Sequence, residues 1–248
     1  MTNVKKPSVN IVIPVYNEEH ELAESIKTLA EYLRAHLTDF IWRITVADNA
    51  SSDTTLSVAR RLTKLYPQVS VVHLPQKGRG RAVKFVWQQD DADIFAYMDV
   101  DLSTDLKHLP PLVRSLTRGY DIAIGTRNAK GSRVYGRSLL RTITSKVYIM
   151  LIKLFFWVHF SDAQCGFKAV TRRVVADIIP KIKDEEWFFD TELLVVAEKM
   201  GYRIYEEPVT WIDNPGSTVR VMKTAQGDLD GLWRLLKTHP WRTYYGRH

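Results

Sequence analysis

Two carboxylates at the end of an apolar run have the type and spacing needed to hold a metal-bound phosphate. Residues 95–98 are apolar or aromatic, and Asp99 and Asp101 follow them with one residue between. Side chains two apart on an extended chain point to the same side, so these two can share one ligand. Mg²⁺ and Mn²⁺ usually take one or two protein carboxylates and complete their coordination with water and substrate phosphates. A second interpretation stays open, in which Asp101 belongs only to a polar turn that caps the next helix.

Three further side chains follow other apolar runs and suit the parts of a nucleotide diphosphate. Tyr16 can flank a base, Asp48 can accept a hydrogen bond from a base N–H, and Lys77 can approach a diphosphate. Each also has a plain structural interpretation: an aromatic at the edge of the core, a turn cap, and a solvated loop cation. Their value as a site therefore depends on whether the fold brings them together.

The hydrophobic pattern predicts the elements that position these side chains. Strands are expected at residues 9–14, 41–47, 69–74, 94–98, 120–126, 202–207 and 209–212. Helices are expected at residues 18–35, 56–65, 82–89, 109–118 and 186–200. Alternating strands and helices predict an α/β fold, Rossmann-like, with a mostly parallel sheet flanked by helices. Ligands of such sheets collect at the carboxyl ends of the strands, where the side chains named above should meet.

Composition limits the class of protein and its partners. A chain of 248 residues with 45% hydrophobic and 25% charged residues is expected to fold as one globular domain with a real core. The single cysteine, Cys165, excludes an intramolecular disulfide and any multi-cysteine metal site. The net charge of +7 predicts anionic partners. A nucleic-acid-binding protein would explain that charge but not the paired acids, which repel phosphates without a metal. No apolar segment of signal-peptide type precedes the first strand, which favours the cytoplasm.

A glycine-rich loop offers a competing nucleotide site. Residues 78–83 are one residue short of a dinucleotide-binding fingerprint, and Asp99 follows at the distance that such a fold requires. Val83 stands at the third glycine position, however, and the loop follows the third predicted strand rather than the first. These departures disfavour a nicotinamide cofactor.

A basic segment follows the fifth predicted strand. Arg127 ends that strand and should point into the same cleft, whereas Arg133, Arg137 and Arg141 recur every four residues and would share one helix face. A phosphate-rich ligand explains the row, and a solvated basic face explains it equally well.

The most apolar stretch of the chain, residues 147–160, bears on membrane association. It is shorter than the ~20 residues that a spanning helix requires, and Lys153 stands in its middle. A helix over residues 138–160 at a membrane interface and a buried core helix are both open interpretations. Asp190 opens a later helix, either as a general base for a hydroxyl acceptor or as a favourable charge at a helix start.

Several motifs together resemble one enzyme family. Residues 9–18, 47–53 and 99–101 resemble the inverting family-2 glycosyltransferases, which have the GT-A fold. Residues 162–168, 189–194 and 214–217 are similar to the dolichyl- or polyprenyl-phosphate sugar synthases, nearer the glucosyl than the mannosyl branch. The family often has two adjacent acids after the second strand, whereas this chain has Ala47 and Asp48.

The resemblance implies roles for particular residues. Pro14, Tyr16, Glu18 and Asp48 would hold the nucleoside, Asp99 and Asp101 would face the ribose and the metal, and Arg127 would bind a phosphate. With the residues already discussed, the predicted catalytic set is Asp99, Asp101, Arg127 and Asp190. Lys77 and Asp99 complete the donor site, and the predicted ligands of the acceptor phosphate are Arg127, Arg133 and Arg137.

The expected protein is a single GT-A domain that transfers a hexose in the presence of Mg²⁺ or Mn²⁺. Residues 9–127 would bind the nucleotide sugar, UDP-glucose rather than GDP-mannose, and residues 128–248 would bind a polyprenyl or dolichyl phosphate. We expect peripheral attachment at the cytoplasmic face of a membrane, with the oligomeric state left open. The alternative is a family-2 enzyme that acts on a soluble or polysaccharide hydroxyl.

Overall fold

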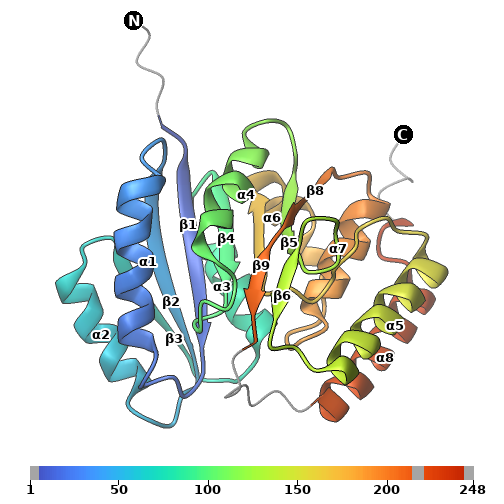
Figure 1. The fold of residues 1–248 in the computed structure, drawn as a ribbon, viewed down its shortest axis with the longest axis horizontal. Helices are drawn as coiled ribbons and strands as arrows, with labels where there is room; N and C mark the ends of the chain where they lie inside the picture. Colours follow the sequence, from blue (N-terminus) through green and yellow to red (C-terminus); the bar gives the residue numbers. More distant parts are fainter. Residues whose placement is uncertain (1–5, 214–220, 243–248) are drawn as a thin grey trace, which may run out of the picture.

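A mostly parallel sheet runs through the middle of the molecule (Figure 1). The structure is a computed structural model that describes residues 6–213 and 221–242. In this part of the chain the sheet has seven strands in the order β3-β2-β1-β4-β7-β5-β8. They are β1 Ser8–Val15, β2 Ile41–Asn49, β3 Val69–Leu74, β4 Ile94–Met98, β5 Ile122–Thr126, β7 Phe167–Thr171 and β8 Ile204–Pro208. A short parallel pair, β6 Arg133–Tyr135 and β9 Thr210–Ile212, lies beside it.

Helices cover both faces of the sheet, as the alternating pattern predicts. Their bounds are α1 Leu22–His36, α2 Thr55–Leu65, α3 Arg79–Gln89, α4 Leu109–Leu116, α5 Leu139–Phe156, α6 Arg172–Asp177, α7 Phe189–Lys199 and α8 Val221–Thr238. Alternate residues of β1 serve the two faces: Ile11 and Ile13 pack with α1, α2 and α4, and Val12 packs with α3, α6 and α7. A central strand buried on both sides must be apolar nearly throughout, which explains the sequence of β1.

The strand order creates an open position where β1 and β4 end. β1 pairs in parallel with β2 on one side and with β4 on the other, so the connections from these strands leave in opposite directions. Ligands of open α/β sheets bind at such a switch point, outside the carboxyl ends of the strands. Residues 14–18 follow β1 and residues 99–101 follow β4, so the fold brings together the segments singled out in the sequence.

One strand of the seven-stranded sheet was not expected from the pattern. β7 runs antiparallel to both of its neighbours, β4 and β5, and separates them in the sheet. Its side chain Lys168 is fully buried, and this charged residue interrupts the apolar run that marks a central strand.

Three other expectations need correction. β4 ends at Met98, so Asp99 and Asp101 lie in a turn and not on an extended strand, and Leu102 after them has a left-handed φ of 49°. The basic row is not one helix face, because Arg133 lies in β6, Arg137 in the following loop and only Arg141 in α5. α5 ends at Phe156 rather than near residue 160. The motif at residues 214–217 lies outside the described residues.

Candidate active site

Asp48, the expected contact to a nucleotide base, is enclosed by the fold. It is fully buried at the end of β2, and its Oδ2 accepts a hydrogen bond from Nδ1 of His73 at 2.6 Å. Its other oxygen, Oδ1, is buried without a hydrogen-bond partner. Tyr16 lies at the end of the neighbouring strand, 37% exposed, with the Lys77 ammonium 3.4 Å from the ring centroid. A buried acceptor beside an aromatic ring has the chemistry of a base-binding site.

The loop after β1 is fixed against the loop after β2. Oγ1 of Thr55 accepts a hydrogen bond from the Glu18 amide at 2.7 Å, and Asn17, with a left-handed φ of 57°, donates its amide to Ser51. This arrangement holds the half-buried Glu18 side chain among other acids. Burial first, and then the charges of Glu21, Asp101, Asp53 and Asp99, raise the pKa of Glu18 to about 7.

Asp99 and Asp101 lie in this concentration of negative charge. The Asp99 amide donates to the carbonyl of Gly166 at 3.2 Å, and a Cβ at Gly166 would collide with the Asp99 carboxylate. Oδ1 of Asp101 accepts from the Ser103 amide at 3.0 Å. Burial, and more weakly the charge of Asp101, raise the pKa of Asp99 against the opposing effect of Arg79.

These residues fit a divalent cation that the substrate helps to hold. Within residues 6–213 and 221–242, no group of three or more His, Cys, Asp or Glu side chains is arranged to hold a metal by itself. Two carboxylates are enough for Mg²⁺ or Mn²⁺ when a diphosphate supplies further oxygens. The raised pKa of Glu18 reflects, after burial, negative charge that such a cation would neutralise.

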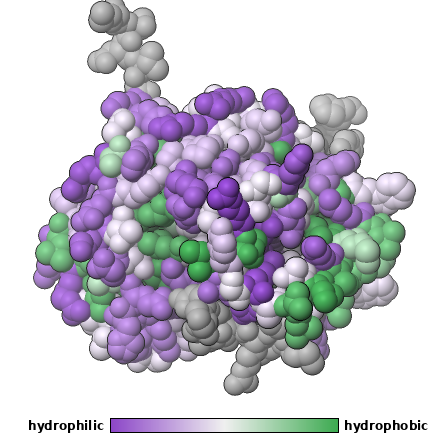
Figure 2. All heavy atoms as spheres, viewed as in Figure 1, coloured by the Kyte–Doolittle hydropathy of each residue, from purple (hydrophilic) through white to green (hydrophobic). Residues whose placement is uncertain are grey.

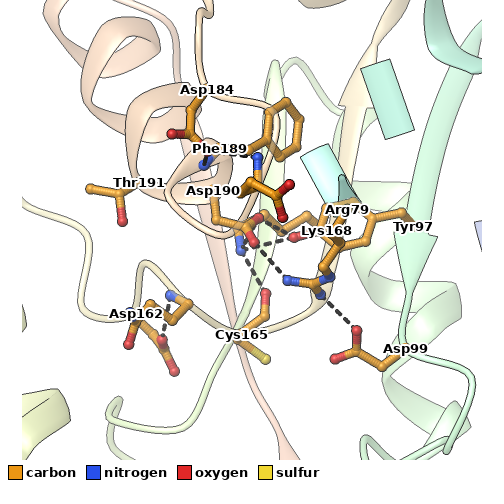
Figure 3. Close-up of polar contacts among 12 residues, drawn as sticks. Arg79, Tyr97, Asp99, Asp162, Cys165, Lys168, Asp184, Phe189, Asp190 and Thr191 are labelled. Carbon is orange, nitrogen blue, oxygen red and sulfur yellow. Dashed lines mark hydrogen bonds and ion pairs between the residues drawn. The ribbon is translucent and has the colours of Figure 1, made fainter. Parts of the chain in front are cut away.

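Arg79 joins the sheet to α7 through a network of buried charges (Figure 3). Its guanidinium lies between two acids and donates to Asp99 Oδ1 at 2.6 Å and to Asp190 Oδ2 at 3.0 Å. On the other side of Asp190, Oδ1 accepts from the Tyr97 hydroxyl and pairs with Lys168 Nζ at 2.9 Å. Burial would lower the pKa of Arg79, but Asp99 and the other acids outweigh it and raise the pKa.

The surroundings of Asp190 bear on its expected role as a base. The residue is only 2% exposed, and both carboxylate oxygens are occupied by Arg79, Lys168 and Tyr97. A general base must reach the proton that it removes. Asp190 is therefore placed to hold Arg79, and through it Asp99.

The glycine loop has a packing function at its observed position. The amides of Gly80 and Arg81 donate to the carbonyls of Glu186 and Glu185, and a Cβ at Gly78 would lie 2.6 Å from the Glu185 carbonyl oxygen. Backbone groups that could hold a phosphate at the start of α3 are thus already paired. The Arg81 side chain forms an ion pair with Glu185 as well.

A cavity of about 280 Å³ opens beside the end of β5. Arg127, Arg137 and Lys146 line it together with polar side chains from α5 and the loop before β6, and with an apolar side chain of β6. Arg127 forms a double ion pair with the buried Asp162, at 2.8 and 3.0 Å. Burial opposes a raised pKa for Arg127, but Asp162, and more weakly Asp99, raise it.

The remaining cations of the basic row have different surroundings. Burial first, and then the charge of Arg127, lower the pKa of Arg137, so an anion in the cavity would be stabilised. Trp211 packs against both guanidiniums, at 5.5 Å from Arg127 and 5.9 Å from Arg137. Arg141 pairs with Asp213 at 2.8 Å. Arg133, expected at the acceptor phosphate, is exposed and does not line the cavity.

An apolar surface continues from the cavity along α5. Figure 2 shows hydrophobic residues gathered over the part of the surface that α5 occupies in Figure 1. The exposed members are Leu139, Leu140, Ile143, Val147, Met150, Leu154, Phe155 and Trp157. The opposite face of α5 packs into the core through Ile152 and Phe156, so the helix is buried on one face only. None of the described helices has the length and apolarity to cross a membrane.

Sequence reasoning missed several residues that shape the site. Asp162 and Lys168 were quoted only as parts of a motif, and His73 and Trp211 were not considered as site residues. Arg79 was treated as a loop cation, although it pairs with an acid 111 positions away. The position of Asp162 at the start of the motif at residues 162–168 was a signal for it. The contacts of the other residues depend on neighbours in space that the local sequence pattern does not reveal.

Comparison with known proteins identifies the class to which this fold and site belong. The model of glycosyl transferase family 2 matches residues 10–179, and the chain belongs to this family. Glycosyltransferase AglD of Haloferax volcanii is 33% identical over 221 residues, which are 88% of this chain and 35% of that protein. A dolichyl-phosphate beta-glucosyltransferase of Drosophila melanogaster is 30% identical over 222 residues, covering 84% of this chain and 68% of that protein. The chain thus spans about a third of the first relative and about two thirds of the second.

The fold also has close counterparts among solved structures. Glucosyl-3-phosphoglycerate synthase from Mycobacterium tuberculosis, crystallised with Mn²⁺, UDP and phosphoglyceric acid, matches with a TM-score of 0.68. The match covers 93% of this chain and 79% of that chain at 16% identity, and so concerns the fold alone. The expected GT-A fold is confirmed.

Proposed function

We propose that this protein is an inverting glycosyltransferase that moves a hexose from a nucleotide sugar to a polyprenyl phosphate. One observation carries the proposal: Glu18, Asp99 and Asp101 cluster at the edge of the sheet, and Arg127, which lines the basic cavity, is close enough to them that Asp99 influences its pKa, after burial and Asp162. A donor diphosphate with its cation suits the acids, and an acceptor phosphate suits the cations. Relatives named dolichyl-phosphate beta-glucosyltransferase support this pairing of substrates.

The donor site is proposed to consist of residues from the first four strands. Pro14, Tyr16 and Glu18 line the nucleoside side, and Asp48 accepts from the base. UDP-glucose is the preferred donor and GDP-mannose the next, a preference supported by the glucosyltransferase relatives. Lys77 is the proposed ligand of the diphosphate, and its ammonium, which lies over the Tyr16 ring, would have to move away from that ring to bind it.

Asp99 and Asp101 would hold Mg²⁺ or Mn²⁺, which when bound stabilises the negative charge of the departing diphosphate. The Mn²⁺ and UDP in the M. tuberculosis structure support this part of the proposal. Arg79 holds Asp99 in place from the protein side.

The acceptor phosphate makes a catalytic base unnecessary. A phosphate monoester is mostly dianionic at neutral pH, since its second pKa is about 6, and its oxygen can attack the anomeric carbon directly. Arg127 and Arg137 would orient that oxygen, so the enzyme supplies position and charge. Asp190, buried in its ion pairs, acts in this scheme as a positioning residue.

Peripheral attachment to the cytoplasmic face of a membrane belongs to the same proposal. The prenyl tail of the acceptor stays in the bilayer, so the cavity has to approach the lipid surface. The exposed apolar residues of α5, adjacent to Arg137 and Lys146, support an interfacial position.

A donor screen tests the proposal. Purified protein is incubated with a short polyprenyl phosphate, Mn²⁺ or Mg²⁺, and either UDP-glucose or GDP-mannose, and products are identified by mass spectrometry. We expect a hexosyl phosphoprenyl product that requires the metal. Asp101→Asn should abolish it, whereas Asp91→Asn, an exposed aspartate between α3 and β4, should not. Transfer only to hydroxyl acceptors would instead favour the soluble or polysaccharide alternative.

A further inference from the structure

We propose that His73 is a specificity-determining residue that makes Asp48 select uracil over guanine. The inference rests on the proposed nucleotide-sugar site and adds to it the reason for the choice of base. It starts from a pair of neighbours in the sheet: Asp48 and His73 stand side by side in the parallel register of β2 and β3.

The pair fixes how many acceptor positions Asp48 can offer. An ionised carboxylate only accepts hydrogen bonds, so Nδ1 of His73 carries the hydrogen in the 2.6 Å contact with Oδ2. Oδ1 is left as a buried acceptor without a partner. Burying an unpaired acceptor is costly, which indicates that a ligand donor completes it.

The number of free acceptors matches one base and not the other. Uracil presents a single N–H, at N3, between two carbonyl groups. Guanine presents N1–H and an adjacent amino group, which together require both oxygens of a carboxylate. Because His73 occupies Oδ2, Asp48 can satisfy uracil but leaves one guanine donor unpaired. A site that leaves a polar group unpaired rejects that ligand strongly.

The surroundings favour a specific effect of His73 over a general one. Its side chain is 44% exposed, so its removal opens no cavity in the core. Asn49, next to Asp48, is already engaged, since its Oδ1 accepts from the Gly78 amide at 2.7 Å. His73 is therefore the side chain that limits the acceptor capacity of Asp48.

Calorimetric titration with free nucleotides tests the inference without relying on turnover. UDP, GDP and CDP are titrated, each with Mn²⁺, into the full chain and into His73→Ala and His73→Asn. Asparagine carries its amide nitrogen at the same number of bonds from Cα as Nδ1 of histidine. His159→Asn, at a distant and exposed histidine, serves as the matched control.

The unaltered protein should prefer UDP and reject CDP, whose N3 has no hydrogen. His73→Ala should narrow the ratio of UDP to GDP affinity about tenfold, because Oδ2 is then free to accept the second guanine donor and a hydrogen bond to a charged group is worth about that much. His73→Asn should restore that ratio. Thermal unfolding confirms that each variant is folded.

Two outcomes separate this inference from the proposed function. If the unaltered chain binds none of the nucleotides, both are overturned. If it binds UDP and His73→Ala keeps the same ratio of UDP to GDP affinity, or CDP binds as well as UDP, the role of His73 is wrong while the glycosyltransferase proposal stands.

Discussion

At the scale of single residues, the proposed donor site gathers several negative charges that a bound cation would neutralise. Glu18, Asp99 and Asp101 lie near one another at one edge of the sheet, and Arg79 supplies a positive charge that pairs with Asp99. Such acids destabilise the folded protein when they are all ionised. Binding sites are often less stable than the scaffold around them for this reason.

Glu18→Gln should change how stability depends on pH. The pKa of Glu18 rises from its usual 4.5 to about 7 on folding, so the folded state holds this proton more tightly than the unfolded state. Stability should therefore fall as pH rises from about 4.5 to about 7, and the glutamine variant should lose this part of the fall. Urea unfolding of both proteins at pH 5 and pH 8 measures the difference.

Mn²⁺ should also change the free energy of unfolding of Glu18→Gln and of the unaltered protein by different amounts. Mn²⁺ should stabilise the unaltered protein more at pH 8 than at pH 5, because more negative charge is then present to be neutralised. Parallel pH profiles for Glu18→Gln and the unaltered protein would contradict the raised pKa of Glu18.

At the scale of elements, Lys168 and Asp190 attach α7 to the sheet. Lys168 comes from β7, is fully buried, and bonds to Asp190 and to the Cys165 carbonyl at 2.5 Å. Each charge depends on the other, since a buried ion without its partner is strongly unfavourable. α7 is therefore held to the sheet by buried charges as well as by the packing of its apolar residues.

Asp190→Asn should mainly affect stability. It leaves the positive charges of Arg79 and Lys168 without their shared partner, at a cost of about 3–5 kcal/mol in the free energy of unfolding. Adding Lys168→Met should recover part of this loss, because the second change removes one of the uncompensated cations. Chemical denaturation of the three variants gives the coupling. A stable Asp190→Asn protein without any activity would instead point to a base and a hydroxyl acceptor.

The exposed face of α5 should control attachment to lipid. Ile143 and Met150 are each 58% exposed, so changing either to glutamate should leave folding intact. Loss of one such contact should reduce binding to anionic vesicles about tenfold, from the free energy of burying an aliphatic side chain. Flotation with and without anionic lipid measures this. Leu65→Glu, 70% exposed on α2, is the control and should float like the unaltered protein.

At the scale of the whole molecule, the donor and the acceptor are proposed to bind in separate places. The acids of the proposed donor site follow β1, β2 and β4, whereas the basic cavity lies beside β5, β6 and α5. Changes in one part should leave binding in the other nearly unaltered when they lie far enough apart.

Arg137→Ala tests this separation. The variant should raise the KM for polyprenyl phosphate at least about tenfold, since a charged hydrogen-bond donor is lost from the cavity. Its affinity for UDP should not change, as measured by calorimetry. If the variant bound UDP and polyprenyl phosphate more weakly by the same factor, separate sites for donor and acceptor would be contradicted.

The local sequence pattern predicted the strands of the sheet better than it predicted the side-chain contacts between elements. Six strands of the sheet fall within about two residues of their expected ends, because apolar runs and turns are determined by the local sequence. β7 was missed, since its buried Lys168 breaks the pattern, and the antiparallel direction depends on where the chain returns. The pairing of Arg79 with Asp190 and of Asp48 with His73 requires the three-dimensional neighbours. The four-residue spacing of Arg133, Arg137 and Arg141 suggested a helix that a short strand replaces.

The position of β7 limits how this enzyme can be taken apart. Its residues come late in the chain, yet it lies inside the sheet between β4 and β5. β8, which follows it in the chain, extends the same sheet by pairing with β5. A fragment that stopped at residue 127 would leave two interior strands with bare edges. Chimeras that exchange the proposed donor and acceptor halves between relatives therefore have to carry compatible β4, β5 and β7 sequences, because strands from the two segments alternate within one sheet.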